Sequence, residues 1–184
     1  TRGALVTGLI AELPTTELSQ LAADIDAGKV TTLLSVGEDL TAAGLNEEHL
    51  AKVNLVYLGS HVNATSAAAK VAIPTLTTFE KSGTFINQQF RMQKFKSAAP
   101  GLKGATDDRV VLAGLLEALG DESKGSDLTS VWAELAETVP ALSGISYANV
   151  PKTGLLLDGS AWDGLDFPEG ESLHFKPAAA EATA

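Results

Sequence analysis

Short apolar runs alternate with amphipathic segments along the first half of the chain. The runs at 30–36 and 54–58 are long enough for buried strands, and a third, very short run at 71–73 ends at Pro74. Between them lie segments with the apolar spacing of helices, which we expect to begin at Thr15 or Thr16, at Asn46 and at Thr65. Strands that alternate with helices at this spacing pair in parallel through right-handed crossovers. The pattern therefore predicts an α/β fold with a parallel twisted sheet flanked by helices.

The second half of the chain begins with two clear helical patterns. One starts at Thr106 to Asp108 and runs to Leu119, and the other spans 127–139 before Pro140. From residue 142 onward, short apolar pieces alternate with glycine and proline, which is typical of a segment that wraps over a surface. We therefore predict an α/β domain over residues 1–150 and an irregular C-terminal tail over 151–184.

The segment between the third strand and the next helix is rich in positive charge. Residues 79–104 contain many turn residues and no sustained period, which predicts a long ordered loop, and such loops usually carry function. From Lys70 to Arg109 the chain has seven of its thirteen basic residues and only three acids, so this basic arm is +4 in a chain of net charge −10. The arm is either a cradle for an anion or cofactor, or a surface that docks on neighbouring domains. We favour docking.

Composition excludes several classes of protein. A chain of 184 residues can bury a core of its own. Its acidic excess argues against nucleic-acid binding, because most of the surface would repel a phosphate backbone. The absence of cysteine excludes disulfides and thiolate-held zinc or iron–sulfur clusters within the chain, and it fits a cytosolic protein. No apolar run approaches the ~20 residues that span a bilayer, and no signal peptide opens the sequence. Because it starts at Thr1 without methionine, we expect a processed or excised piece.

The predicted sheet places its ligand-binding edge at the carboxyl ends of the strands. Those ends are Gly37, Ser60 with its neighbour His61, and Thr75. The histidines do not have the spacing of metal ligands, which predicts no metal site; they are His49, His61 and His174. Several acidic residues occur in pairs near the predicted helix ends. Interaction with the helix dipole explains their positions better than a role in acid–base catalysis. The sequence contains no phosphate-loop or serine-hydrolase motif.

Several motifs in the basic arm resemble one family of redox proteins. The matching positions are the strand Ala69-Lys70-Val71-Ala72-Ile73-Pro74, then Glu80, Gly83, Thr84, Phe85, Asn87, Arg91 and Gln93, and finally Ala98, Pro100-Gly101 and Asp107 or Asp108. On these residues the chain resembles the molybdopterin oxidoreductase superfamily over roughly 1–150. Within that superfamily it is most similar to the C-terminal part of the large iron–sulfur subunit of NADH–quinone oxidoreductase, which is respiratory complex I.

The resemblance implies a formate dehydrogenase/DMSO reductase-like lobe that belongs to a larger subunit. In complex I such a lobe is a scaffold without a redox centre, and the iron–sulfur clusters lie upstream. The partners would be the other domains of the subunit and other complex I subunits. The assembly would be cytoplasmic and peripheral on the inner face of the bacterial cell membrane, with no direct membrane insertion by this chain. The chain alone would then not be catalytic and would hold no cofactor.

The alternative implied by the resemblance is the cofactor-binding portion of a formate dehydrogenase-like enzyme. That lobe would help to hold a molybdopterin guanine dinucleotide, with contacts to its phosphates or pterin from six candidates: Gly37, Ser60, Gly83, Thr84, Asn87 and Arg91. Three of these residues can also have simpler structural roles. Gly83 can adopt a backbone conformation that other residues avoid, and Thr84 and Asn87 can form hydrogen bonds with the local backbone. A third hypothesis is a free-standing module that binds a small anionic ligand.

Three departures from the family pattern favour the scaffold over the cofactor site. Many cofactor-binding relatives have Gly-x-Asn-Pro after the first strand, whereas Gly37 is followed here by two carboxylates, Glu38 and Asp39, which would repel a pyrophosphate. The family's Glu-Gly before the arginine has become Gln89-Phe90, and the aspartate of the third strand has become Lys70. We therefore favour the complex I scaffold.

Overall fold

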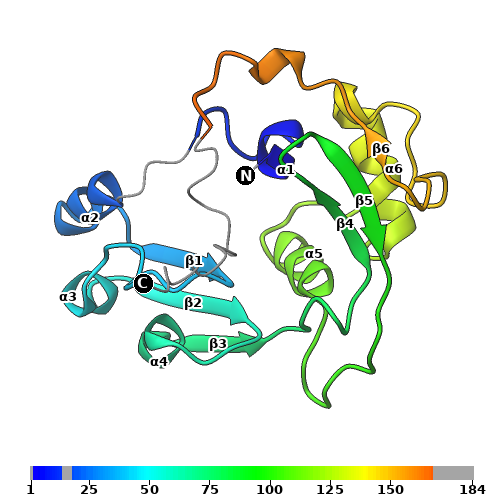
Figure 1. The fold of residues 1–184 in the computed structure, drawn as a ribbon. Coiled ribbons are helices and arrows are strands. Elements are labelled where there is room, and N and C mark those ends of the chain that lie inside the picture. The colour runs from blue at the N-terminus through cyan, green and yellow to red at the C-terminus, as the bar shows by residue number, and fades with distance from the viewer. Residues whose placement is uncertain (1, 14–17, 168–184) are drawn as a thin grey trace, which may run out of the picture.

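The first sheet of the computed structural model, which describes residues 2–13 and 18–167, is parallel (Figure 1). Its order is β1-β2-β3, as the alternation of strands and helices predicts. Helices α2 and α3 cover one face through a core that includes Ile25, Leu50 and the fully buried Leu55. The α/β prediction is therefore confirmed. The elements of this half are α2 (Ser19–Asp26), β1 (Thr32–Val36), α3 (Glu47–Ala51), β2 (Asn54–Gly59), α4 (Ala64–Ala68) and β3 (Val71–Pro74).

Local capping explains where the short helices begin. Asn46 accepts a hydrogen bond from the backbone N–H of His49, whose side chain in turn accepts from the N–H of Asn46. Asn63 and Ser66 make the same reciprocal pair at α4. This helix begins at Ala64, one residue before the start that we predicted. The predicted caps of the first helix, Thr15 and Thr16, lie outside the described residues.

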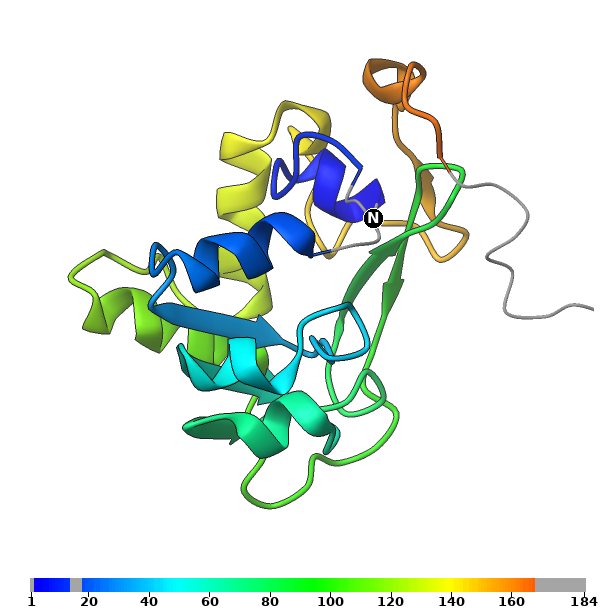
Figure 2. The same ribbon diagram turned by 90° about the vertical axis from the view of Figure 1, so that its left-hand side faces the viewer.

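The second sheet is antiparallel and includes the middle of the basic arm. Strands β4 (Gly83–Ile86) and β5 (Arg91–Phe95) form a hairpin, and β6 (Leu155–Leu156) pairs with β5. Figure 2 shows β4 and β5 as a long ribbon that runs across the direction of the first sheet. The prediction of a long loop over 79–104 was therefore wrong. Strands of four and five residues are too short to give a clear period, and β5 carries Arg, Gln and Lys among its apolar residues.

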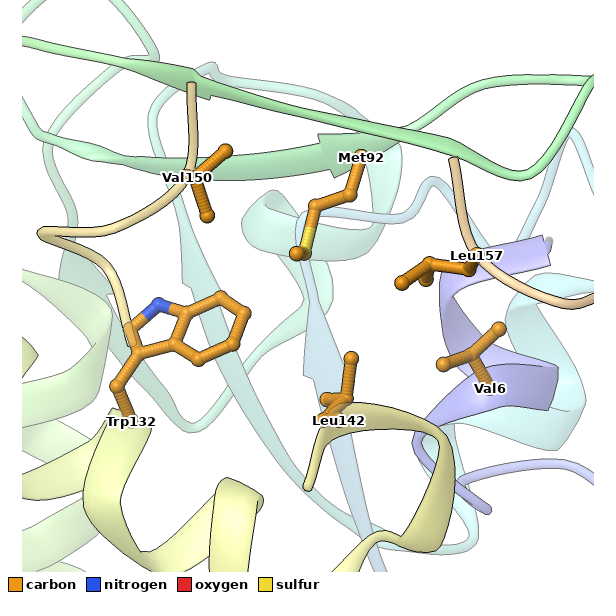
Figure 3. Packing of buried hydrophobic residues seen from close by; sticks show 6 residues of the cluster. All are labelled: Val6, Met92, Trp132, Leu142, Val150 and Leu157. Atoms are coloured by element: carbon orange, nitrogen blue, oxygen red, sulfur yellow. The ribbon is translucent and has the colours of Figure 1, made fainter. Parts of the chain in front are cut away.

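A second hydrophobic core joins this sheet to helices from both ends of the chain. It combines α1 (Arg2–Val6), β5, α6 (Leu128–Thr138), the short 3₁₀ helix at Pro140–Leu142 and the chain after it. Figure 3 shows the buried side chains pointing toward one another: Val6, Met92, Trp132, Leu142, Val150 and Leu157. Residues 151–167 are mostly irregular, as expected, yet Leu157 belongs to this core and β6 to the sheet.

The hairpin turn holds Phe90 in a conformation that favours glycine. Its φ is 56°, in the left-handed region, which costs a non-glycine residue roughly 1–2 kcal/mol. The ring stacks on Trp162 with centroids 5.3 Å apart and meets the edge of Phe167. Gly159 leaves room for the ring, because a Cβ there would lie 2.6 Å from it. The left-handed backbone would suit glycine at this position, and the aromatic contacts of Phe90 offset the strain.

The two helices of the second half lie where the sequence predicted them. Helix α5 (Asp108–Ala118) is capped by Asp107, and α6 is capped by Asp127. Helix α1 was not anticipated, because five residues are too few to show a period. Among residues 2–13 and 18–167, no helix has the length and apolar character needed to cross a bilayer.

Candidate functional site

The carboxyl edge of the parallel sheet holds a cavity of about 310 Å³. It lies where β2 and β3 end, against the first turns of α4. This is the edge at which the strand pattern predicted a site. Its wall is mostly apolar with a few polar groups, and includes Tyr57, Ser60, His61, Ser66, Ile73 and Pro74.

Tyr57 organises the loop that lines one side of this cavity. Its ring folds over Gly59, where a Cβ would lie 2.3 Å from the phenol oxygen. The hydroxyl donates to the carbonyl of His61 at 3.1 Å and accepts from Asn63 Nδ2 at 3.2 Å. Ser60 Oγ lies 2.9 Å from Nδ1 of His61. The sequence analysis missed Tyr57 and Asn63, although the capping pair of Asn63 with Ser66 could have shown that this loop is ordered.

The loop after β1 makes hydrogen bonds within the protein. Gly37 has a φ of 75°, and its N–H donates to the carbonyl of Leu58 at 2.7 Å. The Asp39 carboxylate accepts hydrogen bonds from the hydroxyls of Thr41 and Thr65, and these bonds lower its pKa, the Thr41 hydroxyl contributing most. Asp39 is thus part of the fold, while Glu38 is exposed.

The four candidates on the hairpin have local contacts. Asn87 Oδ1 accepts from the N–H groups of Gln89 and Arg91 and so holds the turn. Arg91 Nη1 lies 3.4 Å from the carbonyl oxygen of Thr153, to which it donates. Gly83 lies under the ring of Phe95, where a Cβ would approach to 2.9 Å. Thr84 lines a separate apolar cavity of about 260 Å³ beside Trp132.

The structure separates the six candidates into two groups. Gly37 and Ser60 lie at ends of neighbouring parallel strands, whereas Gly83, Thr84, Asn87 and Arg91 share the hairpin. Ser60 lines the edge cavity and Thr84 lines the apolar one, so these two candidates face different spaces. That they contact a cofactor stays a prediction. His174 lies outside the described residues, and no group of three potential metal ligands occurs within the described ranges.

The chemistry of the edge cavity suits a planar ring better than a diphosphate. Tyr57, Ile73 and Pro74 provide an apolar wall. Ser60 and His61 add polar atoms to this wall, with Ser60 Oγ 2.9 Å from His61 Nδ1. Among the residues that the structure describes, neither lysine nor arginine lines this cavity, and Glu38 at the adjoining strand end would repel phosphate.

Most basic side chains of the arm bond within the chain. Lys70 donates to Asn54 Oδ1, Lys94 to the carbonyls of Tyr147 and Ala148, and Arg91 to Thr153 as described. Two more form ion pairs with acids of α5 or its cap, Lys81 with Asp108 at 2.7 Å and Arg109 with Asp107. Large apolar side chains of the arm nevertheless remain exposed, namely Phe79, Phe85 and Leu102. The arm folds back on its own lobe and still presents an apolar surface.

The Asp107–Arg109 pair makes stability depend on acid pH. Hydrogen bonds from the Arg109 side chain, more than any other cause, lower the pKa of Asp107 from 3.8 to about 2. A depressed carboxyl pKa stabilises the fold above pH 3.8, and that contribution is lost as pH falls through 2. We expect Asp107→Asn to remove on the order of 1 kcal/mol of unfolding free energy at pH 7, after allowing for solvent screening.

Urea unfolding at pH values from about 7 to about 2 measures this contribution. The difference between the native chain and Asp107→Asn should shrink steadily below about pH 4. The exposed Asp163, changed to asparagine, serves as the control and should leave the unfolding free energy unchanged across the range. A constant difference at all pH values would show that the ion pair is not the cause.

Comparison with known proteins places these motifs in one family. A family model described as molybdopterin oxidoreductase matches residues 2–118. The protein named "Putative formate dehydrogenase YrhE" of Bacillus subtilis is 26% identical over 164 residues, which are 82% of this chain and 17% of that protein. The F420-dependent formate dehydrogenase 2 subunit alpha of Methanococcus maripaludis is 27% identical over 141 residues, 73% of this chain and 20% of that subunit.

A relative of another kind shares the same region. The mitochondrial NADH-ubiquinone oxidoreductase 78 kDa subunit of Neurospora crassa is 32% identical over 114 residues, 61% of this chain and 15% of that subunit. The chain therefore spans about a fifth or less of the length of these three relatives.

Proposed function

Since this chain belongs to the molybdopterin oxidoreductase family, we propose that it forms part of the α/β lobe of a formate dehydrogenase-like oxidoreductase. Two of the three relatives described above have formate dehydrogenase names, and they cover more of this chain than the NADH-ubiquinone oxidoreductase subunit does. This proposal reverses the order of preference drawn from the sequence, where the complex I scaffold came first. As part of a multi-subunit oxidoreductase, the lobe would pack against other subunits or domains.

The observation that carries the proposal is the cavity at the carboxyl edge of the parallel sheet. Its apolar wall beside Tyr57 can accommodate one ring of a pterin or guanine group, and Ser60 and His61 can bond that ring's heteroatoms. This edge offers no cation for the phosphates of such a cofactor among the residues that line the cavity. We therefore expect the phosphates of the cofactor to be held by residues that do not line this cavity.

A second candidate function is the scaffold of a complex I-type subunit. It is favoured by Asn87, which holds its own turn, and by Gly37, whose N–H is already bonded to Leu58. Under this alternative the lobe binds no pterin and acts by supporting its neighbours in an electron-transfer assembly. The relative from Neurospora crassa fits this alternative.

Titration of the 184-residue chain with GMP, followed by two-dimensional NMR, separates the two functions. The enzyme-type lobe should show millimolar binding, with the largest shifts at the amides of Ser60 and His61. Ser60→Ala should weaken that binding about fivefold or more, since it removes a hydrogen bond to the ring. Ser143→Ala, at an exposed position away from the cavity, should leave the affinity unchanged. If GMP at about 10 mM shifts neither amide, the cofactor role of this edge is wrong and the scaffold function stands.

A further inference from the structure

We propose that the chain has a second ligand site, a small basic cavity that binds a phosphate-type oxyanion. The cavity has a volume of about 400 Å³ and lies between the ends of the hairpin and the first turns of α5 and α6. Its basic and hydroxyl side chains come from three separate parts of the chain: Lys81 and Ser82, Lys96 and Ser97, and Arg109. Lys81 is paired with Asp108 at 2.7 Å, and the hydroxyl of Tyr147, which also lines the cavity, donates to the carbonyl of Phe95 at 2.6 Å. This site is distinct from the edge cavity, and the inference does not rest on the proposed function.

The acids of this cavity are already engaged by the protein. Asp107 accepts hydrogen bonds from the backbone N–H, the Nε and the Nη2 of Arg109. Glu80 accepts from the N–H and the hydroxyl of Thr77 through one oxygen, and from the N–H of Leu102 through the other. Both carboxylates are therefore held in place by their own neighbours, and in the described part of the chain neither forms an ion pair with Lys96.

Two of the cations keep donors that have no acceptor among the described residues. Lys96 forms no hydrogen bond or ion pair with any residue in the described ranges, and its side chain lines the cavity. The Nη1 of Arg109 is buried and has no hydrogen-bond partner in that part of the chain. A buried donor left unpaired costs roughly 1–3 kcal/mol, so a small shift of the guanidinium that brings this nitrogen to an acceptor in the cavity is favoured.

The missing partner is best supplied by a compact group that only accepts hydrogen bonds. Guanidinium and ammonium donors that converge from different segments are typical of oxyanion recognition, and the hydroxyls of Ser82 and Ser97 add further donors. The space is large enough for a phosphoryl group with a few waters, and too small for a folded partner. We therefore assign the ligand as a phosphoryl oxyanion, either free phosphate or a phosphoryl group on a small organic molecule.

Titration of the 184-residue chain with inorganic phosphate, at ionic strength held constant with chloride, tests this site. We expect saturable shifts of the backbone amides of Ser82, Ser97 and Arg109, with a millimolar dissociation constant. A parallel titration with glycerol 3-phosphate distinguishes the sources: equal affinity indicates that a carried phosphoryl group is accepted, and loss of binding indicates free phosphate. Shifts that rise linearly to about 50 mM without saturation, or that occur evenly over the surface, would overturn the proposal.

Two lysines of the same arm provide the decisive comparison. Lys96→Gln should weaken phosphate binding about fivefold or more, because it removes the free cation from the cavity. Lys103→Gln removes the same charge from an exposed position of the arm that does not line the cavity, and should change the affinity less than about twofold. Equal weakening by both variants would show general charge attraction and refute the site. Lys96 is exposed, so both variants should unfold at the same urea concentration as the native chain.

Discussion

Replacing Trp132 by alanine is expected to lower the free energy of unfolding by about 3–5 kcal/mol. The indole is only 4% exposed and lies in the core formed by Met92, Leu142 and Val150 (Figure 3). Removing it leaves a cavity between elements that no other large ring can fill. Because domains of this size are stable by only about 5–15 kcal/mol, the loss would be a large part of the total. Urea unfolding followed by far-UV circular dichroism measures it.

The second tryptophan serves as the control for this prediction. Trp162 is half-buried and stacks on Phe90. Trp162→Ala should therefore lower the free energy of unfolding by about 0.5–1.5 kcal/mol for the lost ring stacking, in addition to the small contribution of its buried apolar area. Trp132→Phe, which keeps an aromatic ring in the core, should lose less than Trp132→Ala. Equal losses for the two alanine variants would mean that β5, α6 and the chain after residue 142 do not share one core.

Thr65→Val should destabilise the chain by about 1–3 kcal/mol although the two side chains have the same shape. Thr65 is fully buried, and its hydroxyl accepts from the N–H of Leu40 at 2.7 Å and donates to Asp39 Oδ1 at 3.0 Å. The methyl group of valine leaves the N–H of Leu40 buried and unpaired. The same variant removes one of the two hydroxyl hydrogen bonds to Asp39, so the loop after β1 should also become more mobile.

Thr65→Ser separates the hydroxyl from the packing of the side chain. It retains both hydrogen bonds and loses one methyl group, which should cost about 1 kcal/mol. Hydrogen exchange at the amides of Leu40 and Thr41 should accelerate in Thr65→Val and not in Thr65→Ser. If the two variants were equally stable, the hydroxyl of Thr65 would contribute nothing to stability, and Asp39 would be held chiefly by Thr41.

The edge cavity and the basic cavity could be predicted from the sequence to different degrees. The position of Ser60 and His61 at a strand end followed from the order of strands and helices. Four of the six proposed contacts lie instead on a hairpin that the sequence presented as a loop. The basic character of the arm was evident from its composition. The sequence did not show which of its basic side chains form internal ion pairs, or that Lys96 forms none within the described residues.

The sequence by itself determined the parallel sheet, its helices and the cap at Asn46, because these depend on periodicity and on hydrogen bonds across three or four residues. The tertiary structure alone decided that β4, β5 and β6 form a sheet and that Lys81, Lys96 and Arg109 line one cavity. Those arrangements depend on contacts between distant segments, such as Lys94 with the carbonyl of Ala148. Short strands have little preference of their own, so the partners that the fold brings beside them determine their structure.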